Sequence, residues 1–216
     1  MSIKRPEQPV PDYVPAHDLL AGKVVVVTAA AGAGIGASVT RRALEEGAKA
    51  VVLSDTHERR VAEAQESLAA EFGAERVRAM TCDVTDEAQV NALLDAADEF
   101  GGVDIMINNA SVIGWRAQEG QAHYAAAKAG VMALTRCSAL DLAPLGIRVN
   151  AVSPSLAMHP FLAKVTTDEL LAELKQREAF GRAAEPWEVA NVMVFLASDY
   201  ASYMTGEVIA VSSQQA

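Results

Sequence analysis

The sequence predicts an α/β fold, in which helices cover both faces of a doubly wound parallel sheet. Two observations indicate it: short runs rich in Val and Ile alternate with longer segments of helical periodicity, and aromatic residues make up only 5% of the 216 residues. Alternating strands and helices favour parallel pairing through right-handed crossovers. We expect one domain, because a single hydrophobic core commonly extends over up to about 250 residues.

Six short apolar runs are the expected strands. Val24–Val27 is wholly β-branched, which is typical of a strand buried on both faces. The second run ends at Asp55, where a polar residue marks the end of the strand. The expected strands cover residues 24–27, 50–55, 77–82, 103–107, 147–152 and 208–211.

Six helices are expected between and after these strands. Ile35, Val39 and Ala43 recur at helical spacing until Gly47 ends the first of them. The expected helices cover residues 35–47, 58–72, 86–100, 120–143, 167–177 and 186–198. Residues 1–20 are polar and rich in proline, so we expect a flexible, loosely attached N-terminal extension of a domain that covers residues 21–216.

The composition excludes several classes of partner. A net charge of −10, with no basic patch to offset it, disfavours binding to nucleic acid or to an anionic membrane. The apolar runs are far too short to span a bilayer. Pro6, Pro9 and Pro11 interrupt the region where a secretory signal would be apolar, so we expect a cytoplasmic protein. Cys82 and Cys137 form no CxxC motif and are expected to be buried thiols.

A glycine-rich turn joins the first strand to the first helix. Glycines allow the backbone to approach a pyrophosphate closely, and a helix N-terminus offers free N–H groups and the positive end of a dipole. This context favours a Rossmann-type dinucleotide site over a plain glycine-rich turn, which is the alternative. The residues expected to contact the cofactor here are Thr28, Ala30, Gly32, Gly34, Ile35 and Gly36.

Asp55 indicates which dinucleotide the site prefers. It ends the second strand, 19 positions after Gly36. A carboxylate at this position can accept both ribose hydroxyls of NAD and would repel the 2′-phosphate of NADP. The alternative is a surface Asp that caps the next helix. We predict NAD as the cofactor, with NADP as the secondary alternative because Arg59 and Arg60 lie close in sequence.

Tyr124 and Lys128 are the candidate catalytic pair. They lie four positions apart and therefore share a face of the expected helix, although such a pair is common by chance on helix surfaces. Ser111 precedes Tyr124 by 13 positions. With this Ser, Tyr and Lys spacing, the sequence resembles the short-chain dehydrogenase/reductase family. Further matching motifs are the glycine turn, Cys82–Val84, Asn108–Ala110, Asn150–Pro154, Gly181–Arg182, Pro186–Ala190, Phe195–Asp199 and Tyr203–Gly206.

The resemblance implies a role for each catalytic residue. A free tyrosine has a pKa of about 10, and a neighbouring ammonium favours its phenolate form. Tyr124 is therefore expected to act as general acid for carbonyl reduction or as general base for alcohol oxidation. Lys128 would lower the pKa of Tyr124 and hold the nicotinamide ribose, and Ser111 would hydrogen-bond the substrate oxygen.

The resemblance also implies further contacts with the cofactor. Asp83 and Val84 would lie at the adenine. The segment that begins at Pro154 would cover the nicotinamide carboxamide. The full set of implied cofactor residues beyond the glycine turn and Asp55 is Asp83, Val84, Asn109, Ala110, Tyr124, Lys128, Pro154, Ser155 and Ala157. We predict no metal site.

The sequence departs from the family pattern between Asn109 and Ser111. The family has a helix and a further strand between these motifs, whereas here the two residues are two positions apart. A parallel crossover needs a dozen or more residues. We therefore expect a fold that is one strand and one helix short, in which residues 103–110 begin as the fourth strand and end as the fifth. The missing helix would also weaken the homodimer or homotetramer typical of the family.

Two functions remain open from the sequence. The first is an active oxidoreductase that interconverts a secondary alcohol and a ketone. The second is a truncated, catalytically impaired relative that only binds dinucleotide. Residues 111–118 and 211–214 are similar to bacterial relatives that act on hydroxyacyl- or ketoacyl-CoA intermediates of steroid-ring breakdown, and also to 3-oxoacyl carrier-protein reductases. A CoA thioester is therefore a candidate substrate.

Overall fold

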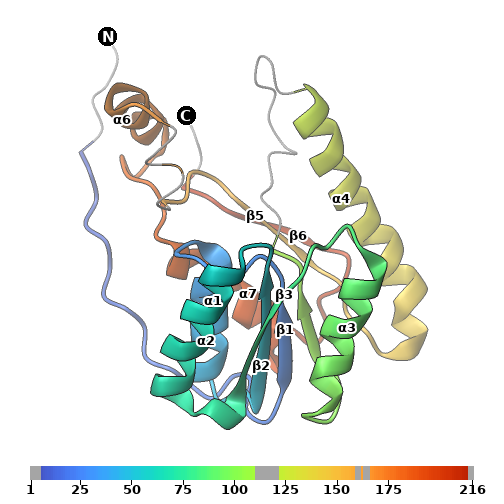
Figure 1. Cartoon of the computed structure of the whole chain (residues 1–216). Helices are drawn as coiled ribbons and strands as arrows, with labels where there is room; N and C mark the ends of the chain where they lie inside the picture. The colour runs from blue at the N-terminus through green and yellow to red at the C-terminus, as the bar shows by residue number, and fades with distance from the viewer. Residues whose placement is uncertain (1–5, 110–121, 159–161, 163–165, 214–216) are drawn as a thin grey trace. The chain divides into compact units, whose positions relative to one another are not determined.

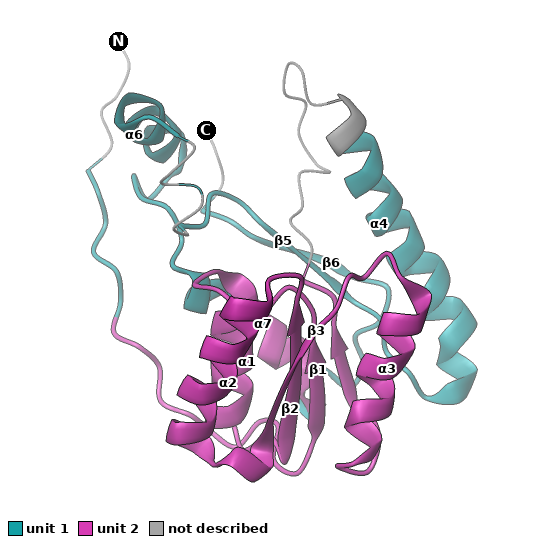
Figure 2. Cartoon of the chain, viewed as in Figure 1, with its two compact units in different colours: residues 1–11, 111–192, 199–216 teal, residues 12–110, 193–198 magenta. Residues whose placement is uncertain are grey.

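The computed structural model describes residues 6–109, 122–158, 162 and 166–213. The chain divides into two compact units, which Figure 2 colours separately. Unit 1 consists of residues 1–11, 111–192 and 199–216, and unit 2 consists of residues 12–110 and 193–198. Because each unit combines separate stretches of the chain, the division does not separate successive domains.

The strands and helices follow the predicted order (Figure 1). The strands are β1 (Val24–Val27), β2 (Ala50–Asp55), β3 (Val77–Thr81), β4 (Ile105–Ile107), β5 (Ala151–Pro154) and β6 (Val208–Val211). The α-helices are α1 (Ile35–Glu45), α2 (Glu58–Phe72), α3 (Glu87–Asp98), α4 (Ala122–Leu142), α6 (Asp168–Arg177) and α7 (Pro186–Ala197). Three short 3₁₀ helices were not predicted: η1 (Ala74–Arg76), η2 (Ala143–Leu145) and η3 (Asp199–Ala201).

Unit 2 is built on a four-stranded parallel sheet with the order β3-β2-β1-β4. Because the order reverses at β1, right-handed crossovers place α1 and α2 on one face and α3 on the other (Figure 1). Val24 and Val26 pack into a core cluster with Leu93 of α3. The alternate residues, Val25 and Val27, are also fully buried. β1 is therefore covered on both faces, as its β-branched sequence predicts.

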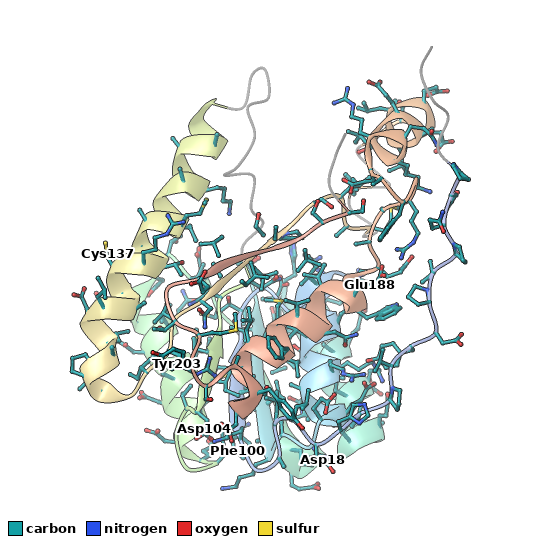
Figure 3. All side chains as sticks on the ribbon, turned by 180° about the vertical axis from the view of Figure 1, so that it is seen from behind. Asp18, Phe100, Asp104, Cys137, Glu188 and Tyr203 are labelled. Carbon is teal, nitrogen blue, oxygen red and sulfur yellow. The ribbon has the colours of Figure 1, made fainter. Side chains whose placement is uncertain are left out.

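Two strands begin later than the sequence predicts. β4 starts at Ile105 because Gly101 and Gly102 adopt positive φ and Asp104 caps the sheet, its Oδ2 accepting a hydrogen bond from the N–H of Val24 at 2.8 Å (Figure 3). β5 starts at Ala151 instead of residue 147. The segment before it is bonded by side chains, since Asn150 Nδ2 donates to the carbonyl of Met204 at 2.8 Å.

Residues 15–19 make hydrogen bonds to side chains at the C-terminal end of α1. Glu46 is buried and accepts hydrogen bonds from the N–H groups of His17 at 2.8 Å and Leu19 at 3.0 Å. Arg42, which is also buried, pairs with Glu46 and donates to the carbonyl of Pro15 at 3.1 Å. The buried charges of Arg42 on α1 and Glu46 at its C-cap need polar partners, and the backbone of this segment supplies them.

Unit 1 contains a two-stranded parallel sheet of β5 and β6, with α4, α6 and the first part of α7. The side chains of Leu134 and Leu140 on α4 are exposed. Cys137, labelled in Figure 3, lies on the same face, one turn from each. Its exposure corrects the expectation that both thiols are buried; Cys82 is buried as expected. In the parts of the chain that the structure describes, no helix is long and apolar enough to cross a bilayer.

Candidate active site

The candidate cofactor residues of unit 2 lie along one edge of its sheet. Thr28 follows β1, Asp55 ends β2, Asp83 comes shortly after β3, and Asn109 comes shortly after β4. All four strands are parallel, so their carboxyl ends meet at the same edge. In open α/β sheets this edge is where ligands bind, near the point at which the strand order reverses.

Asn109 joins the end of β4 to the glycine turn. Its N–H donates to Thr28 Oγ1 at 3.3 Å, and its Nδ2 donates to the carbonyl oxygen of Ala29 at 3.1 Å. Gly36 lies against the hydrogen bond between Asn109 and Ala29: a Cβ at this position would come within 2.4 Å of the Ala29 oxygen and 2.6 Å of Asn109 Nδ2. Only glycine allows this close approach. The shape of the turn therefore depends on the contacts of Asn109 with Thr28 and Ala29, which lie about 80 positions away in the chain.

The start of α1 leaves backbone donors for a ligand. Its N-cap is Gly34, and no side chain caps the helix there. The first N–H groups of a helix have no partner within the helix, and they favour an anion. Gly32, which precedes the helix, is exposed and carries no side chain that could block access. The described residues of this turn therefore fit the pyrophosphate of a dinucleotide.

Asp55 is positioned by its own turn and by a neighbouring cation. Its Oδ1 accepts a hydrogen bond from the N–H of His57 at 3.2 Å and lies 3.8 Å from an Nη atom of Arg60. His57 is the N-cap of α2, but its side chain makes no capping bond. The carboxylate thus holds the turn before α2 and does not cap the helix itself. Its other oxygen makes no hydrogen bond that the described residues record.

Asp83 and Val84 differ in their availability. Asp83 Oδ1 accepts hydrogen bonds from the N–H and the hydroxyl of Thr85, at 2.9 and 2.8 Å. These two donors hold the pKa of Asp83 below its ordinary value. The side chain of Val84 is 57% exposed although it is apolar. Of this pair, Val84 presents the open apolar surface that an adenine ring requires, and Asp83 shapes the turn.

The catalytic candidates belong to unit 1. Tyr124 and Lys128 both lie in α4, one helical turn apart, Tyr124 near its N-terminal end. Lys128 is half-buried, and burial lowers its pKa from the ordinary value. Ser111 and Ala110, predicted to be catalytic and cofactor-binding respectively, lie outside the described residues, as does the side chain of Tyr124.

The segment after β5 is held by bonds that the sequence did not suggest. Ser155 donates from its N–H to the carbonyl of Val211 at 3.0 Å and from its hydroxyl to Glu178 at 3.1 Å. Glu178 is 1% exposed and also accepts a hydrogen bond from the hydroxyl of Ser213 at 2.7 Å. Ala157 forms a parallel bridge with Ala184. Pro154, Ser155 and Ala157 are therefore fixed by three separate parts of unit 1.

A small pocket of about 140 Å³ opens beside Ser155 and Glu178. Arg182 and Glu188 also line it. Their paired atoms lie 2.7 and 2.8 Å apart, and this bidentate pairing holds the pKa of Glu188 (Figure 3) below its ordinary value. Each charge is therefore neutralised by the other, and the pair stabilises one wall of the pocket.

Comparison with known proteins identifies the family. A family model described as short chain dehydrogenase matches residues 23–118, and one described as Enoyl-(Acyl carrier protein) reductase matches residues 110–213. A curated relative from Mycobacterium tuberculosis is 50% identical, with 94% of this chain and 97% of the relative covered. The chain belongs to the short-chain dehydrogenase/reductase family. It is thus related to oxidoreductases that act on hydroxyl and ketone groups, and the family uses NAD(P).

Two named relatives and one solved structure are similar to this chain over most of its length. The M. tuberculosis protein is a (5R,7aS)-5-hydroxy-7a-methyl-1-oxo-2,3,5,6,7,7a-hexahydro-1H-indene-carboxyl-CoA reductase. A cis-4-hydroxycyclohexanecarboxylate dehydrogenase from Sinomonas cyclohexanicum is 36% identical, with 90% of this chain and 96% of the relative covered. The crystal structure of a short chain dehydrogenase from Mycobacterium smegmatis matches with a TM-score of 0.82 at 45% identity, over 96% of this chain and 99% of that one. The predicted family and Rossmann-type fold are confirmed.

The alignment with the M. tuberculosis reductase is longer than this chain. It extends over 256 positions, whereas this chain has 216 residues, so at least 40 positions of the alignment have no residue here. The two family models also meet between residues 110 and 118, next to the junction of Asn109 and Ser111.

Sequence reasoning missed two residues of this site. Arg60 was noted only as a cation near Asp55 in the chain, and its place in the first turn of the helix that follows Asp55 is the signal that could have placed it beside the turn. Glu178 gave no signal, because a single Glu at the end of a charged helix is ordinary surface. Its contacts with Ser155 and Ser213 span 23 and 35 positions.

Proposed function

We propose that this chain binds NAD(H) at the carboxyl edge of the β1–β4 sheet and interconverts a secondary alcohol and a ketone. The observation that carries the proposal is the turn formed by Thr28, Gly36 and Asn109, which leaves the donors at the start of α1 without a side-chain cap. The Asp55 carboxylate, at the end of the neighbouring strand, supports NAD over NADP because it can accept ribose hydroxyls.

The residues of α4 would handle the proton. The cofactor supplies or accepts hydride when it is bound. Tyr124 would donate its phenolic proton to the developing alkoxide during reduction and take a proton from the hydroxyl during oxidation. The Lys128 ammonium, one turn away, would favour the phenolate of Tyr124, and Ser111 would hydrogen-bond the substrate oxygen.

The substrate we propose is a ring-borne hydroxyl or ketone on a molecule that also carries a carboxylate or its CoA thioester. Two relatives support this choice, since the names of both place a hydroxyl and a carboxyl group on a carbocyclic ring. The segment from Pro154 to Ala157 is braced by Glu178 and Ala184, which would keep one wall of the substrate site rigid.

A second function has its own observation. At least 40 aligned positions of the M. tuberculosis reductase have no counterpart here, which supports an internally truncated chain. Such a chain would bind dinucleotide through unit 2 and turn substrate over slowly, because a displacement of 1 Å at the reacting atoms can cost about a hundredfold in rate.

One pair of measurements separates the two functions. NADH is titrated by its fluorescence, and reduction of ring ketones bearing a carboxylate or CoA thioester is followed at the same protein concentration. Turnover that Tyr124→Phe abolishes, and that Tyr203→Phe leaves unchanged, supports the oxidoreductase; Tyr203 is a fully exposed control for the same substitution. Saturable binding without turnover supports the truncated relative. Absence of both would overturn both proposals.

A further inference from the structure

Residues 6–8 lie against the turn that follows α6. The N–H of Gln8 donates to the carbonyl of Phe180 at 2.8 Å. Gly181 approaches the same segment so closely that a Cβ at this position would lie 2.8 Å from the carbonyl oxygen of Pro6. Both segments belong to unit 1, which Figure 2 colours teal. One hydrogen bond and one close packing contact therefore seat this segment on a single turn.

The turn also supports the pocket beside Ser155. The N–H of Gly181 donates to the carbonyl of Glu178 at 3.0 Å and closes the turn, with a φ of +66° at Gly181. The buried side chain of Glu178 accepts hydrogen bonds from the hydroxyls of Ser155 and Ser213, at 3.1 and 2.7 Å. Glu178 and Phe180 both line the pocket. This one turn therefore contacts the N-terminal residues and also fixes the segment after β5.

Few contacts hold residues 6–8 in place. All three are exposed, and they make a single backbone hydrogen bond among the described residues. Arg182 follows the turn, and its hydrogen bond to Glu188 raises its pKa. The charges of Glu185 and Glu7 raise this pKa further, so Glu7 attracts Arg182 as well. Segments with so few contacts open at a low cost in free energy, so residues 6–8 can leave the turn without unfolding unit 1.

We infer that residues 6–8 are a strap that regulates the candidate substrate site: docked on the turn, they order Glu178 and Ser155, and released, they leave both mobile. A ligand that needs the ordered wall must then restrict it on binding, which lowers its affinity. The effect on substrate rests on the proposed function, because it requires the segment from Pro154 to Ala157 to be a wall of the substrate site. The effect of the strap on the turn is independent of that function.

A pair of proline substitutions tests the strap. Gln8→Pro removes the N–H that donates to Phe180, because proline has no N–H. Val10→Pro is the matched control, since Val10 is exposed, belongs to the same unit and has an N–H with no hydrogen bond that the described residues record. Both variants add one proline to a segment already rich in proline. A difference between them therefore reports the lost hydrogen bond and not the stiffer chain.

Hydrogen–deuterium exchange of the whole chain, read by mass spectrometry, measures the order of the turn. The amides of Gly181 and Ser155 are both hydrogen-bonded and report its opening. Gln8→Pro is expected to speed their exchange about threefold to tenfold, as the net loss of one hydrogen bond predicts. Val10→Pro is expected to change it by less than about twofold. Exchange of the β1 amides in unit 2 should be equal in all three proteins, which shows that the fold is intact.

Reduction of a ring ketone bearing a carboxylate, with NADH, measures the effect on the site. Gln8→Pro is expected to raise KM about threefold or more and to leave kcat within about twofold, because the strap orders a wall and touches no reacting atom. The Kd for NADH should not change, since the cofactor residues of the glycine turn belong to unit 2.

The outcomes separate this inference from the proposed function. Unchanged exchange of the turn in Gln8→Pro, or equal acceleration in Val10→Pro, would overturn the strap. Faster exchange with an unchanged KM would overturn its control of the substrate site. If the unmodified chain shows no turnover, the proposed function and the effect on substrate fail together, whereas the exchange rates still decide whether the strap holds the turn.

Discussion

The two units of the chain differ in how completely their strands are covered. In unit 2 every residue of β1 is buried, as are the first five residues of β2. In unit 1 only Ser153 of β5 is buried, and β6 has no buried residue. Strands of a parallel sheet are normally covered on both faces. The difference teaches that β1 and β2 form a centre of unit 2 that is covered on both faces, while its outer strands β3 and β4 each have one buried residue. Unit 1 has the partial exposure expected if neighbouring elements are absent.

The same contrast extends to the helices. α1 buries six of its residues, including Val39 and Leu44. The longer helix α4 leaves Leu134 and Leu140 exposed, at 64% and 79%. Apolar side chains in such positions usually meet a partner element. A missing crossover between Asn109 and Ser111 would remove one such partner from unit 1 and leave the cofactor residues of unit 2 intact.

The largest predicted effect comes from restoring that crossover. We expect that inserting, between Asn109 and Ser111, the corresponding segment of the M. tuberculosis reductase raises kcat for ketone reduction by about 100-fold or more. Neighbouring strands are about 4.8 Å apart, so the insertion would move the catalytic helix by that distance relative to the cofactor. The Kd for NADH is expected to change little, because Thr28 and Asn109 already contact each other.

A Gly/Ser linker of equal length is the control for this insertion. It lengthens the chain without supplying a strand or a helix, so it should leave kcat low. Equal kcat values for the unmodified chain and the restored chain would contradict this account, because unit 1 would then need no inserted segment for catalysis.

Two glycine substitutions, one in each unit, test how tightly the two units are packed at these positions. Gly36 in α1 and Gly130 in α4 are both within helices. A Cβ at Gly36 would lie 2.4 Å from the Ala29 oxygen, so Gly36→Ala is expected to destabilise the protein by about 1–3 kcal/mol and to weaken NADH binding. Among the described residues nothing lies within 4 Å of a Cβ at Gly130, so Gly130→Ala is expected to stabilise the protein by up to about 1 kcal/mol.

Urea denaturation monitored by circular dichroism measures both changes, and the NADH titration is repeated for each variant. The opposite signs follow from the tight turn in one unit and the open helix in the other. Two midpoints that shift by the same amount in the same direction would contradict this account of the glycine turn.

The sequence predicts those parts of the molecule that depend on local pattern. The bounds of β1, β2 and α2 agree with prediction, because a β-branched run or an amphipathic segment with glycine or polar ends has few alternative structures. The start of β5 was wrong because the apolar residues before it are bonded through Asn150 and Thr205 side chains, which no periodicity reveals.

Contacts over long sequence separations account for the rest. The glycine turn was predicted as a motif, yet its shape depends on Asn109 Nδ2 and the Ala29 oxygen, which lie 80 positions apart. The same is true of the bonds from residues 13–20 to α1, because Arg42 and Glu46 look like an ordinary surface pair on a helix until their burial is known. The roles assigned to Ser111, Tyr124 and Lys128 stay predictions.

The smallest predicted effect concerns strain within the better-packed unit. Ala29 is a non-glycine residue in the glycine turn, and its φ is +51°. A residue with a Cβ is disfavoured in this left-handed region, whereas glycine adopts it freely. Ala29→Gly is therefore expected to stabilise the protein by about 0.5–1 kcal/mol, after allowance for the greater freedom of glycine in the unfolded chain.

Ala30→Gly is the matched control, since Ala30 is 3% exposed and does not have a positive φ. It should destabilise the protein by about 0.5–1 kcal/mol, because it adds unfolded-state freedom without relieving strain. The urea midpoints of the two variants should therefore move in opposite directions. If Ala29→Gly lowers the midpoint as Ala30→Gly does, the left-handed turn carries no strain. The glycine turn would then owe its shape to the Asn109 contact and the close approach of Gly36, and not to any conformational demand on residue 29.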